Sequence, residues 1–150
     1  LDFVTEGLKI HIKRSKTDQF GEGYTKALPY FDNTKYCPVG NLKKWINISK
    51  INSGPLFRRF SKGSKLSEHR LTDQTVALLI KEYLTLANMD SKNYSGHSLR
   101  SGFATVSAES GADERSIMTM TGHKSTDMVR RYIREANLFK NNALNKIKTI

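Results

Sequence analysis

The sequence predicts a mainly α-helical domain with a small antiparallel β-ribbon near its start. The ribbon is indicated by an early stretch in which apolar and polar residues alternate, followed by a polar loop that contains two glycines. The helices are indicated by apolar residues that recur every three or four positions between residues that favour helix ends. At 150 residues the chain is long enough for one domain with its own core.

The predicted ribbon covers residues 1–28. Its first strand has apolar residues at every second position, which is the spacing of a half-buried strand: Leu8, Ile10 and Ile12. The return strand is predicted over residues 24–28. Residues 14–23 lie between the two strands and are expected to form a long hairpin loop, with the sequence RSKTDQFGEG.

The next predicted helix begins near Pro38, because proline suits the first turn of a helix, and ends before Asn52. Its apolar stripe consists of Val39, Leu42, Trp45 and Ile46. Residues 55–57 are expected to pack on the core in an extended conformation. Residues 58–65 are expected to form a flexible basic loop, whose charges either contact nucleic-acid phosphates or are simply solvated.

The clearest helical pattern follows a cap at Thr72 or Asp73. Its apolar residues recur at spacings of three and one: Val76, Leu79, Ile80, Tyr83, Leu84 and Ala87. Such a pattern predicts a helix with a broad buried face. Residues 88–95 are polar and lack this periodicity, so we expect a loop there.

Three shorter helices are predicted in the following stretch. The first is expected to run from Ser98 to Gly111, with Leu99, Phe103 and Val106 on its inner face. The second is expected to begin after a cap at Asp113 and to end at Gly122, and its inward-facing residues are Ile117 and Met118.

The third of these helices is expected to begin at Ser125 or Thr126. Its apolar face is formed by Met128, Val129, Tyr132 and Ile133. Because one helix ends at Gly122 and the next begins only a few residues later, His123 is expected to lie in a tight turn. The final apolar residues, within 137–150, are expected either to pack on their own domain or to dock on a neighbouring copy.

Four polar residues form an ordered pattern across these helices: His97, Arg100, His123 and Tyr132. Histidines donate hydrogen bonds, and the arginine fork matches two phosphate oxygens. A tyrosine hydroxyl can act as a covalent nucleophile. Fixed donors around a phenol suit attack on a phosphodiester, because they stabilise the negative charge that develops. Each residue taken alone is better explained as a polar surface residue or, for the tyrosine, as a core residue, whereas the ordered set of four favours the phosphate chemistry.

The residues that carry this pattern resemble a known family. GHSLRSGFAT resembles the H-x-x-R box of the tyrosine recombinases, the phage-integrase family, and TGHKSTDMVRRY resembles the box that holds the family's G-H pair and nucleophilic tyrosine. The likeness extends upstream to the ribbon and covers most of the chain. The resemblance implies a helical catalytic core of the tyrosine-recombinase type.

The resemblance also implies a role for each site residue. Tyr132 would attack a DNA phosphodiester and form a 3′-phosphotyrosine, while Arg100, His97 and His123 bind the phosphate. Lys16, followed by a threonine as in the family's hairpin, would act as general acid on the 5′-oxygen. Four further cations are expected to contact the DNA backbone: Lys13, Arg14, Arg130 and Arg131.

The amino-acid composition limits the kinds of binding partner that the chain can be expected to have. Lys and Arg total 25 against 14 Asp and Glu, so the net charge is +11, which suggests a polyanionic partner or, more simply, solubility. Double-stranded DNA is the expected partner, and the resemblance implies a homotetramer on DNA for the full-length protein. Neither a long apolar run nor an acidic metal-binding cluster is evident, so no membrane, metal or other cofactor is expected. With Cys37 as the single cysteine, no internal disulfide is possible and a reducing cytoplasm fits. A DNA-binding protein in the cytoplasm is expected to be associated with the nucleoid.

One feature of the family has no match in the sequence. The family's first catalytic arginine lies on a helix before the hairpin, and this chain starts at the hairpin. We therefore expect residues 1–150 to be a truncated catalytic domain that lacks its N-terminal helices and the separate N-terminal DNA-binding domain, and to be inactive alone. Two alternatives stay open: a DNA-binding module without chemistry, and a relaxing enzyme of the type IB topoisomerase kind.

Overall fold

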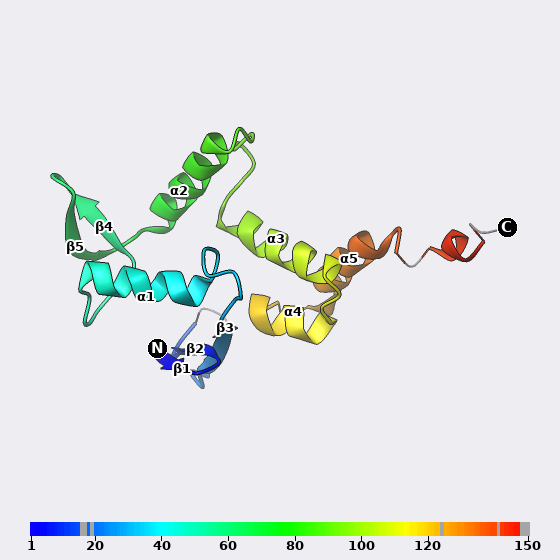
Figure 1. The fold of residues 1–150 in the computed structure, drawn as a ribbon, viewed down its shortest axis with the longest axis horizontal. Coiled ribbons are helices and arrows are strands. Elements are labelled where there is room, and N and C mark those ends of the chain that lie inside the picture. Colours follow the sequence, from blue (N-terminus) through cyan, green and yellow to red (C-terminus); the bar gives the residue numbers. More distant parts are fainter. Residues whose placement is uncertain (16–17, 19, 124, 141, 148–150) are drawn as a thin grey trace. The chain divides into compact units, whose positions relative to one another are not determined.

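A computed structural model describes residues 1–15, 18, 20–123, 125–140 and 142–147 (Figure 1). The chain divides into two compact units, Leu1–Leu71 and Thr72–Ile150. The described residues contain five α-helices and two small antiparallel sheets. The predicted fold class, mainly α-helical with a small β-ribbon, is confirmed.

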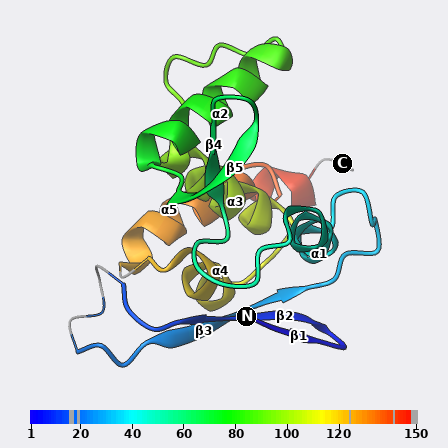
Figure 2. The same ribbon diagram turned by 90° about the vertical axis from the view of Figure 1, so that its left-hand side faces the viewer.

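The predicted ribbon is present as part of a three-stranded antiparallel sheet (Figure 2). Strands β2 (Gly7–Ile12) and β3 (Tyr24–Pro29) pair in the register that places Leu8 opposite Leu28. An additional short strand, β1 (Asp2–Val4), pairs with the other edge of β2. The alternating apolar residues of β2 therefore lie on the side of the sheet that faces the core of this unit.

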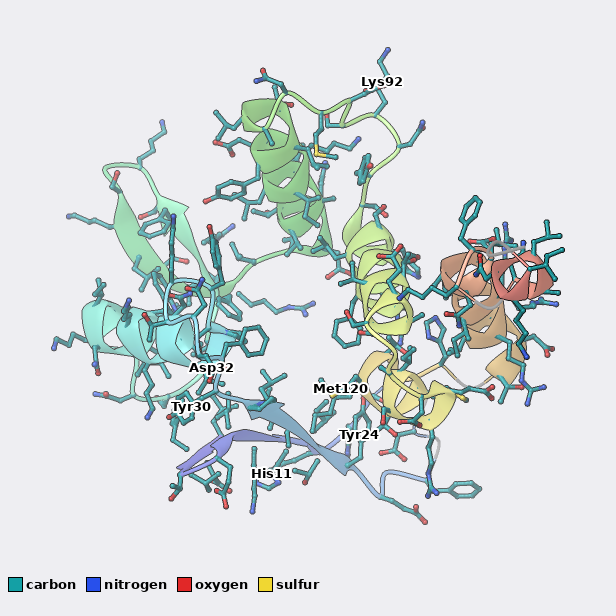
Figure 3. All side chains as sticks on the ribbon, turned by 45° about the vertical axis from the view of Figure 1, so that its right-hand side comes forward. His11, Tyr24, Tyr30, Asp32, Lys92 and Met120 are labelled. Carbon is teal, nitrogen blue, oxygen red and sulfur yellow. The ribbon has the colours of Figure 1, made fainter. Side chains whose placement is uncertain are left out.

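The histidine of β2 is a structural residue of the sheet (Figure 3). Its Nε2 lies 2.6 Å from Asp2 Oδ2 on β1, and its Nδ1 lies 2.8 Å from Thr25 Oγ1 on β3. The hydrogen bond from His11 holds the pKa of the Asp2 carboxyl below its usual value. His11 thus connects all three strands through side chains.

Helix α1 (Pro38–Ser49) packs on this sheet. The Cys37 thiol caps it by accepting a hydrogen bond from the Gly40 N–H at 3.4 Å, and Lys50 ends it in the left-handed conformation (φ 55°). Leu8, Cys37 and Val39 are buried together as the core of this unit. The predicted stripe is confirmed, since Leu42, Trp45 and Ile46 are half-buried.

Residues 58–65 are not the flexible loop that the sequence indicated. They belong to a β-hairpin of strands β4 (Arg58–Ser61) and β5 (Lys65–Arg70), which pair antiparallel with Phe60 opposite Leu66. Positive φ angles at Gly63 (77°) and Ser64 (57°) reverse the chain between them. The expected core packing of residues 55–57 is wrong for Phe57, which is exposed. The hairpin was missed because backbone pairing, not an apolar face, organises it.

Helix α2 (Asp73–Leu86) is confirmed, with Thr72 as its cap: the Thr72 Oγ1 accepts a hydrogen bond from the Thr75 N–H at 3.1 Å. Its predicted broad buried face is wrong, because no residue of the helix is fully buried and Tyr83 is 70% exposed.

Helices α3 (Gly96–Glu109), α4 (Glu114–Thr121) and α5 (Thr126–Asn137) form the core of the second unit (Figure 1). The caps at Asp113 and Ser125 and the end of α4 at Gly122 are as predicted. The first of the three begins at Gly96, not at Ser98, whose hydroxyl accepts a hydrogen bond from the Ser95 N–H at 3.0 Å.

The inner face of α3 differs from the prediction. Leu99, Phe103 and Val106 are exposed, and the buried residues of the helix are Ala104 and Ala108. They pack with Ile117 of α4 and Val129 of α5. Small side chains let the backbones of neighbouring helices approach closely, so the alanine face packs on α4 and α5, whereas the larger residues do not.

The apolar faces of α2 and α3 instead line a cavity of about 710 Å³. Leu79, Ile80 and Tyr83 contribute from α2, and Leu99 and Phe103 from α3. This shared cavity explains why both helices have strong apolar stripes and little buried surface.

The last described element is a short 3₁₀ helix, Ala143–Lys146. Its residue Leu144 is exposed, as are Phe139 before it and Ile147 after it. Across the described residues, no helix combines the length and the apolar character that a bilayer crossing needs. The same residues contain no group of three or more His, Cys, Asp or Glu that could hold a metal ion.

Candidate active site

Tyr132 lies on α5 at the contact with α3. Its ring is half-buried and packs against the core cluster of the second unit. Its hydroxyl donates a hydrogen bond of 3.0 Å to Ser101 Oγ on α3. The phenol oxygen is therefore held at a helix–helix contact by a fixed polar neighbour.

Arg100 precedes Ser101 on α3 and is connected to the end of α4. Its guanidinium donates a hydrogen bond to the backbone carbonyl of Thr121. Thr121 is the last residue of α4, where carbonyl groups have no partner inside the helix and carry the negative end of the helix dipole. The carbonyl thus holds the arginine without neutralising its charge.

His123 lies in the turn between α4 and α5. Gly122 ends α4 in the left-handed conformation (φ 69°), where a glycine is favoured, and this turn places His123 beside the helix end. His123 Nδ1 lies 2.7 Å from Thr121 Oγ1. The centroid of its ring lies 6.5 Å from that of Tyr132, with 46° between the ring planes. The expected tight turn at His123 is confirmed.

The pKa of His123 is lowered from its ordinary value, first because burial disfavours the charged ring and second because the Arg100 charge repels it. On lowering the pH, the His123 ring is therefore protonated at a higher pH in the unfolded chain than in the folded chain. The contribution of His123 to folding stability is therefore complete above about pH 6.5 and falls as the pH decreases toward the lowered pKa.

We expect an NMR titration of the His123 Cε1 proton in the DNA-free protein to give a midpoint below about 6.5. In an Arg100→Gln variant, which keeps the burial and removes the charge, the midpoint should move part of the way back. A wild-type midpoint at or above the ordinary value would show that burial and Arg100 do not control this ring.

His97 lies in the first turn of α3 and is exposed. It is three residues before Arg100 on the same helix, and residues at this spacing lie on the same face. Arg100, His123 and Tyr132 are thus gathered at the junction of α3, α4 and α5, with His97 one turn away.

Two residues of this junction were not identified from the sequence. Ser101 holds the Tyr132 hydroxyl, and Thr121 holds both Arg100 and His123. The available signal was position alone, since each lies within two residues of a predicted site residue. Serine and threonine are too common in helices for that signal to single them out.

The other predicted site residues take no part in the hydrogen bonds described above for Tyr132, Arg100 and His123. Arg130 Nε lies 2.9 Å from Glu114 Oε2 and Arg131 Nε lies 3.0 Å from Glu135 Oε1, and both arginines are exposed. Lys13 and Arg14 are exposed and belong to the first unit, after β2. Lys16 lies outside the described residues.

The junction has the groups needed to hold a phosphate beside a nucleophile. The Arg100 fork is a strong donor to phosphate oxygens, the His123 imidazole can donate to them when it is protonated, and Tyr132 supplies a hydroxyl next to both. The cavity between α2 and α3 has a different character, because its lining is almost wholly apolar. It does not suit an anionic group.

The mainly helical fold is consistent with a core domain of the tyrosine-recombinase type. The chain belongs to the Phage integrase family, whose model matches residues 35–138. The chain is 44% identical over 147 residues to an integrase/recombinase XerD homolog of Selenomonas ruminantium, covering 98% of this chain and 43% of that protein. It is 36% identical over 63 residues to the tyrosine recombinase XerC of Syntrophus aciditrophicus (strain SB), covering 42% of this chain and 20% of that protein. The chain therefore spans less than half the length of these relatives.

Proposed function

We propose that this chain is the catalytic part of a site-specific DNA recombinase that cleaves and rejoins DNA through a 3′-phosphotyrosine at Tyr132. The observation that carries the proposal is the junction of α3, α4 and α5, where Tyr132, Arg100 and His123 are held through Ser101 and Thr121. Membership of the family and the names of the relatives support the same function.

In the proposed reaction, the Tyr132 oxygen attacks the phosphorus, and the bond from phosphorus to the 5′-oxygen breaks. We assign His97 to accept the tyrosine proton and Lys16 to protonate the departing 5′-oxygen. Arg100 and protonated His123 stabilise the charge on the non-bridging oxygens. A 5′-hydroxyl of a second strand then attacks, the phosphorus–tyrosine bond breaks, and the strand is rejoined without a high-energy cofactor.

Double-stranded DNA is the proposed partner, and its phosphates would meet a chain of net charge +11. Lys13 and Arg14 are exposed and can contact phosphates directly. Arg130 and Arg131 already pair with carboxylates, so a phosphate must share or replace those partners. Exposed ion pairs of this kind are weak, typically about 0 to 1 kcal/mol, so replacement is feasible.

We expect binding of the chain to duplex DNA to weaken steeply as the salt concentration rises, because each neutralised phosphate releases counterions. Each such phosphate makes the negative slope of the logarithm of the association constant against the logarithm of the salt concentration steeper by about 0.9. Fluorescence anisotropy between 50 and 200 mM salt measures that slope. Lys13→Ala should reduce its magnitude by about 1. The matched variant Glu135→Gln, which frees Arg131, should instead tighten binding. Affinity that ignored salt would contradict the proposed phosphate contacts.

The proposed chemistry is tested by incubating the full-length protein with a nicked duplex. After cleavage of this duplex, the short fragment that carries the 5′-hydroxyl dissociates, so the strand cannot be rejoined. A covalent protein–DNA band is expected, whereas a DNA-binding module without chemistry gives only the non-covalent complex. Joining of two different duplexes, with four protein copies in the complex, is then expected for a recombinase. Relaxation of supercoiled DNA without such joining would favour the type IB topoisomerase alternative.

A further inference from the structure

We infer that Thr121 is a positioning residue of the active site, which sets the protonated nitrogen of His123 and anchors Arg100. Among the described residues it is the one polar side chain that is buried, with only 6% exposed. A buried hydroxyl needs hydrogen-bond partners, because its removal from water is otherwise costly. The partners of Thr121 are what connect it to the site.

The hydroxyl of Thr121 makes two short contacts. It donates to the Ile117 carbonyl at 2.7 Å, and it lies 2.7 Å from His123 Nδ1. A hydroxyl has one hydrogen, and a carbonyl oxygen can only accept. Both contacts are therefore made at once only if His123 Nδ1 carries a hydrogen and donates it to Thr121. The geometry selects this tautomer over the one protonated at Nε2.

The selected tautomer determines what His123 can offer a substrate. With Nδ1 bound to Thr121, Nε2 is the ring nitrogen that remains for another partner. It accepts a hydrogen bond while the ring is neutral and donates one to a phosphate oxygen only after the ring takes up a proton. A ring held at Nδ1 also has less rotational freedom to lose when it meets the phosphate.

The backbone of Thr121 completes the arrangement. Its carbonyl accepts the hydrogen bond from Arg100, so one residue holds both proposed phosphate ligands, one through its main chain and one through its side chain. Gly122 follows Thr121 in the left-handed conformation, and this turn brings His123 back toward the Thr121 hydroxyl. The hydroxyl therefore contacts His123 while the carbonyl contacts Arg100. Substitution of the side chain therefore tests the His123 contact while leaving the carbonyl in place.

The test uses full-length protein with ¹⁵N-labelled histidine, in which the His123 signals are assigned by comparison with His123→Gln. We expect wild-type His123 to carry its hydrogen on Nδ1 in the neutral ring. Thr121→Val, which keeps a branched side chain and removes the hydroxyl, should shift the ring toward the Nε2 form. It should also slow formation of the covalent adduct by about 10- to 100-fold, by analogy with residues that orient metal-binding histidines. Thr121→Ser should retain both the tautomer and the rate.

A wild-type His123 protonated at Nε2 would overturn the inference, as would a Thr121→Val protein with an unchanged tautomer and rate. The effect on rate rests on the proposed function, but the tautomer does not. Absence of any adduct in the wild type would refute the proposed function, while the ¹⁵N signals would still support or overturn the role of Thr121. The wild-type measurement needs no substitution, so poor folding of a variant does not prevent the test.

Discussion

Tyr132→Phe is expected to abolish the covalent DNA adduct in the full-length protein while DNA binding stays nearly unchanged. The substitution removes one oxygen, the proposed nucleophile, and keeps the ring that packs against the core of α3, α4 and α5. The folded protein loses the hydrogen bond from Tyr132 to Ser101, which typically contributes about 0.5 to 1.5 kcal/mol. Denaturing gels measure the adduct, and gel shifts measure binding.

Ser101→Ala is the matched control for this prediction. It removes the same hydrogen bond from the other side and leaves the nucleophile in place. We expect the Ser101 variant to form adduct and the Tyr132 variant to form none. Adduct in the Phe variant would mean that another residue attacks the phosphate, and the assignment of Tyr132 would be wrong.

Lys16→Ala is expected to slow DNA cleavage by about 10² to 10⁴, the usual contribution of a positioned general acid. The 5′-oxygen is a poor leaving group unless it is protonated, whereas a sulfur in the same position leaves as a thiolate. A substrate with a bridging 5′-sulfur should therefore largely restore the rate of the variant. Single-turnover cleavage of the two substrates gives both rates.

Lys13→Ala provides the comparison for Lys16, because Lys13 is an exposed cation that follows β2 and precedes the same loop. As a proposed phosphate contact, it should affect DNA affinity more than the rate of cleavage, and sulfur should not rescue it selectively. Equal defects of Lys16→Ala on the oxygen and sulfur substrates would show that Lys16 is a phosphate contact and not the acid.

The elements that sequence predicted well are those with local chemical signals. Pro38, Thr72 and Asp113 mark helix starts, and Gly122 marks an end, because capping depends on residues within one turn. The alternation of Leu8, Ile10 and Ile12 similarly predicted a strand. Such features need no knowledge of which surface covers them.

Predictions of burial were less successful, because burial depends on tertiary partners. The sequence pattern predicts that the large apolar residues of α3 face the core, but its small residues Ala104 and Ala108 make the close contacts with α4 and α5. The hairpin after α1 was missed for a related reason. Its strands are held by pairing between mostly polar segments, so no apolar face marks them in the sequence.

The residues of the candidate site likewise fall into those with a local sequence signal and those whose role depends on tertiary contacts. His97, Arg100, His123 and Tyr132 could be named from their ordered spacing and from the resemblance that it carries. Ser101 and Thr121 could not be named in this way, because their roles come from contacts between distant parts of the chain. Ser101 contacts Tyr132, 31 positions away, and Thr121 contacts Arg100, 21 positions away. Residues that orient others are visible only once the helices are assembled.

The proposed covalent attachment of Tyr132 to DNA can be measured directly at the attachment site. Full-length protein is trapped on a nicked duplex, the complex is digested with protease and nuclease, and the modified peptide is sequenced by mass spectrometry. We expect one modified peptide, with a nucleotide joined through its 3′-phosphate to Tyr132. A nucleotide on any other residue, or DNA that is bound and cut without a covalent peptide, would contradict the proposed attachment.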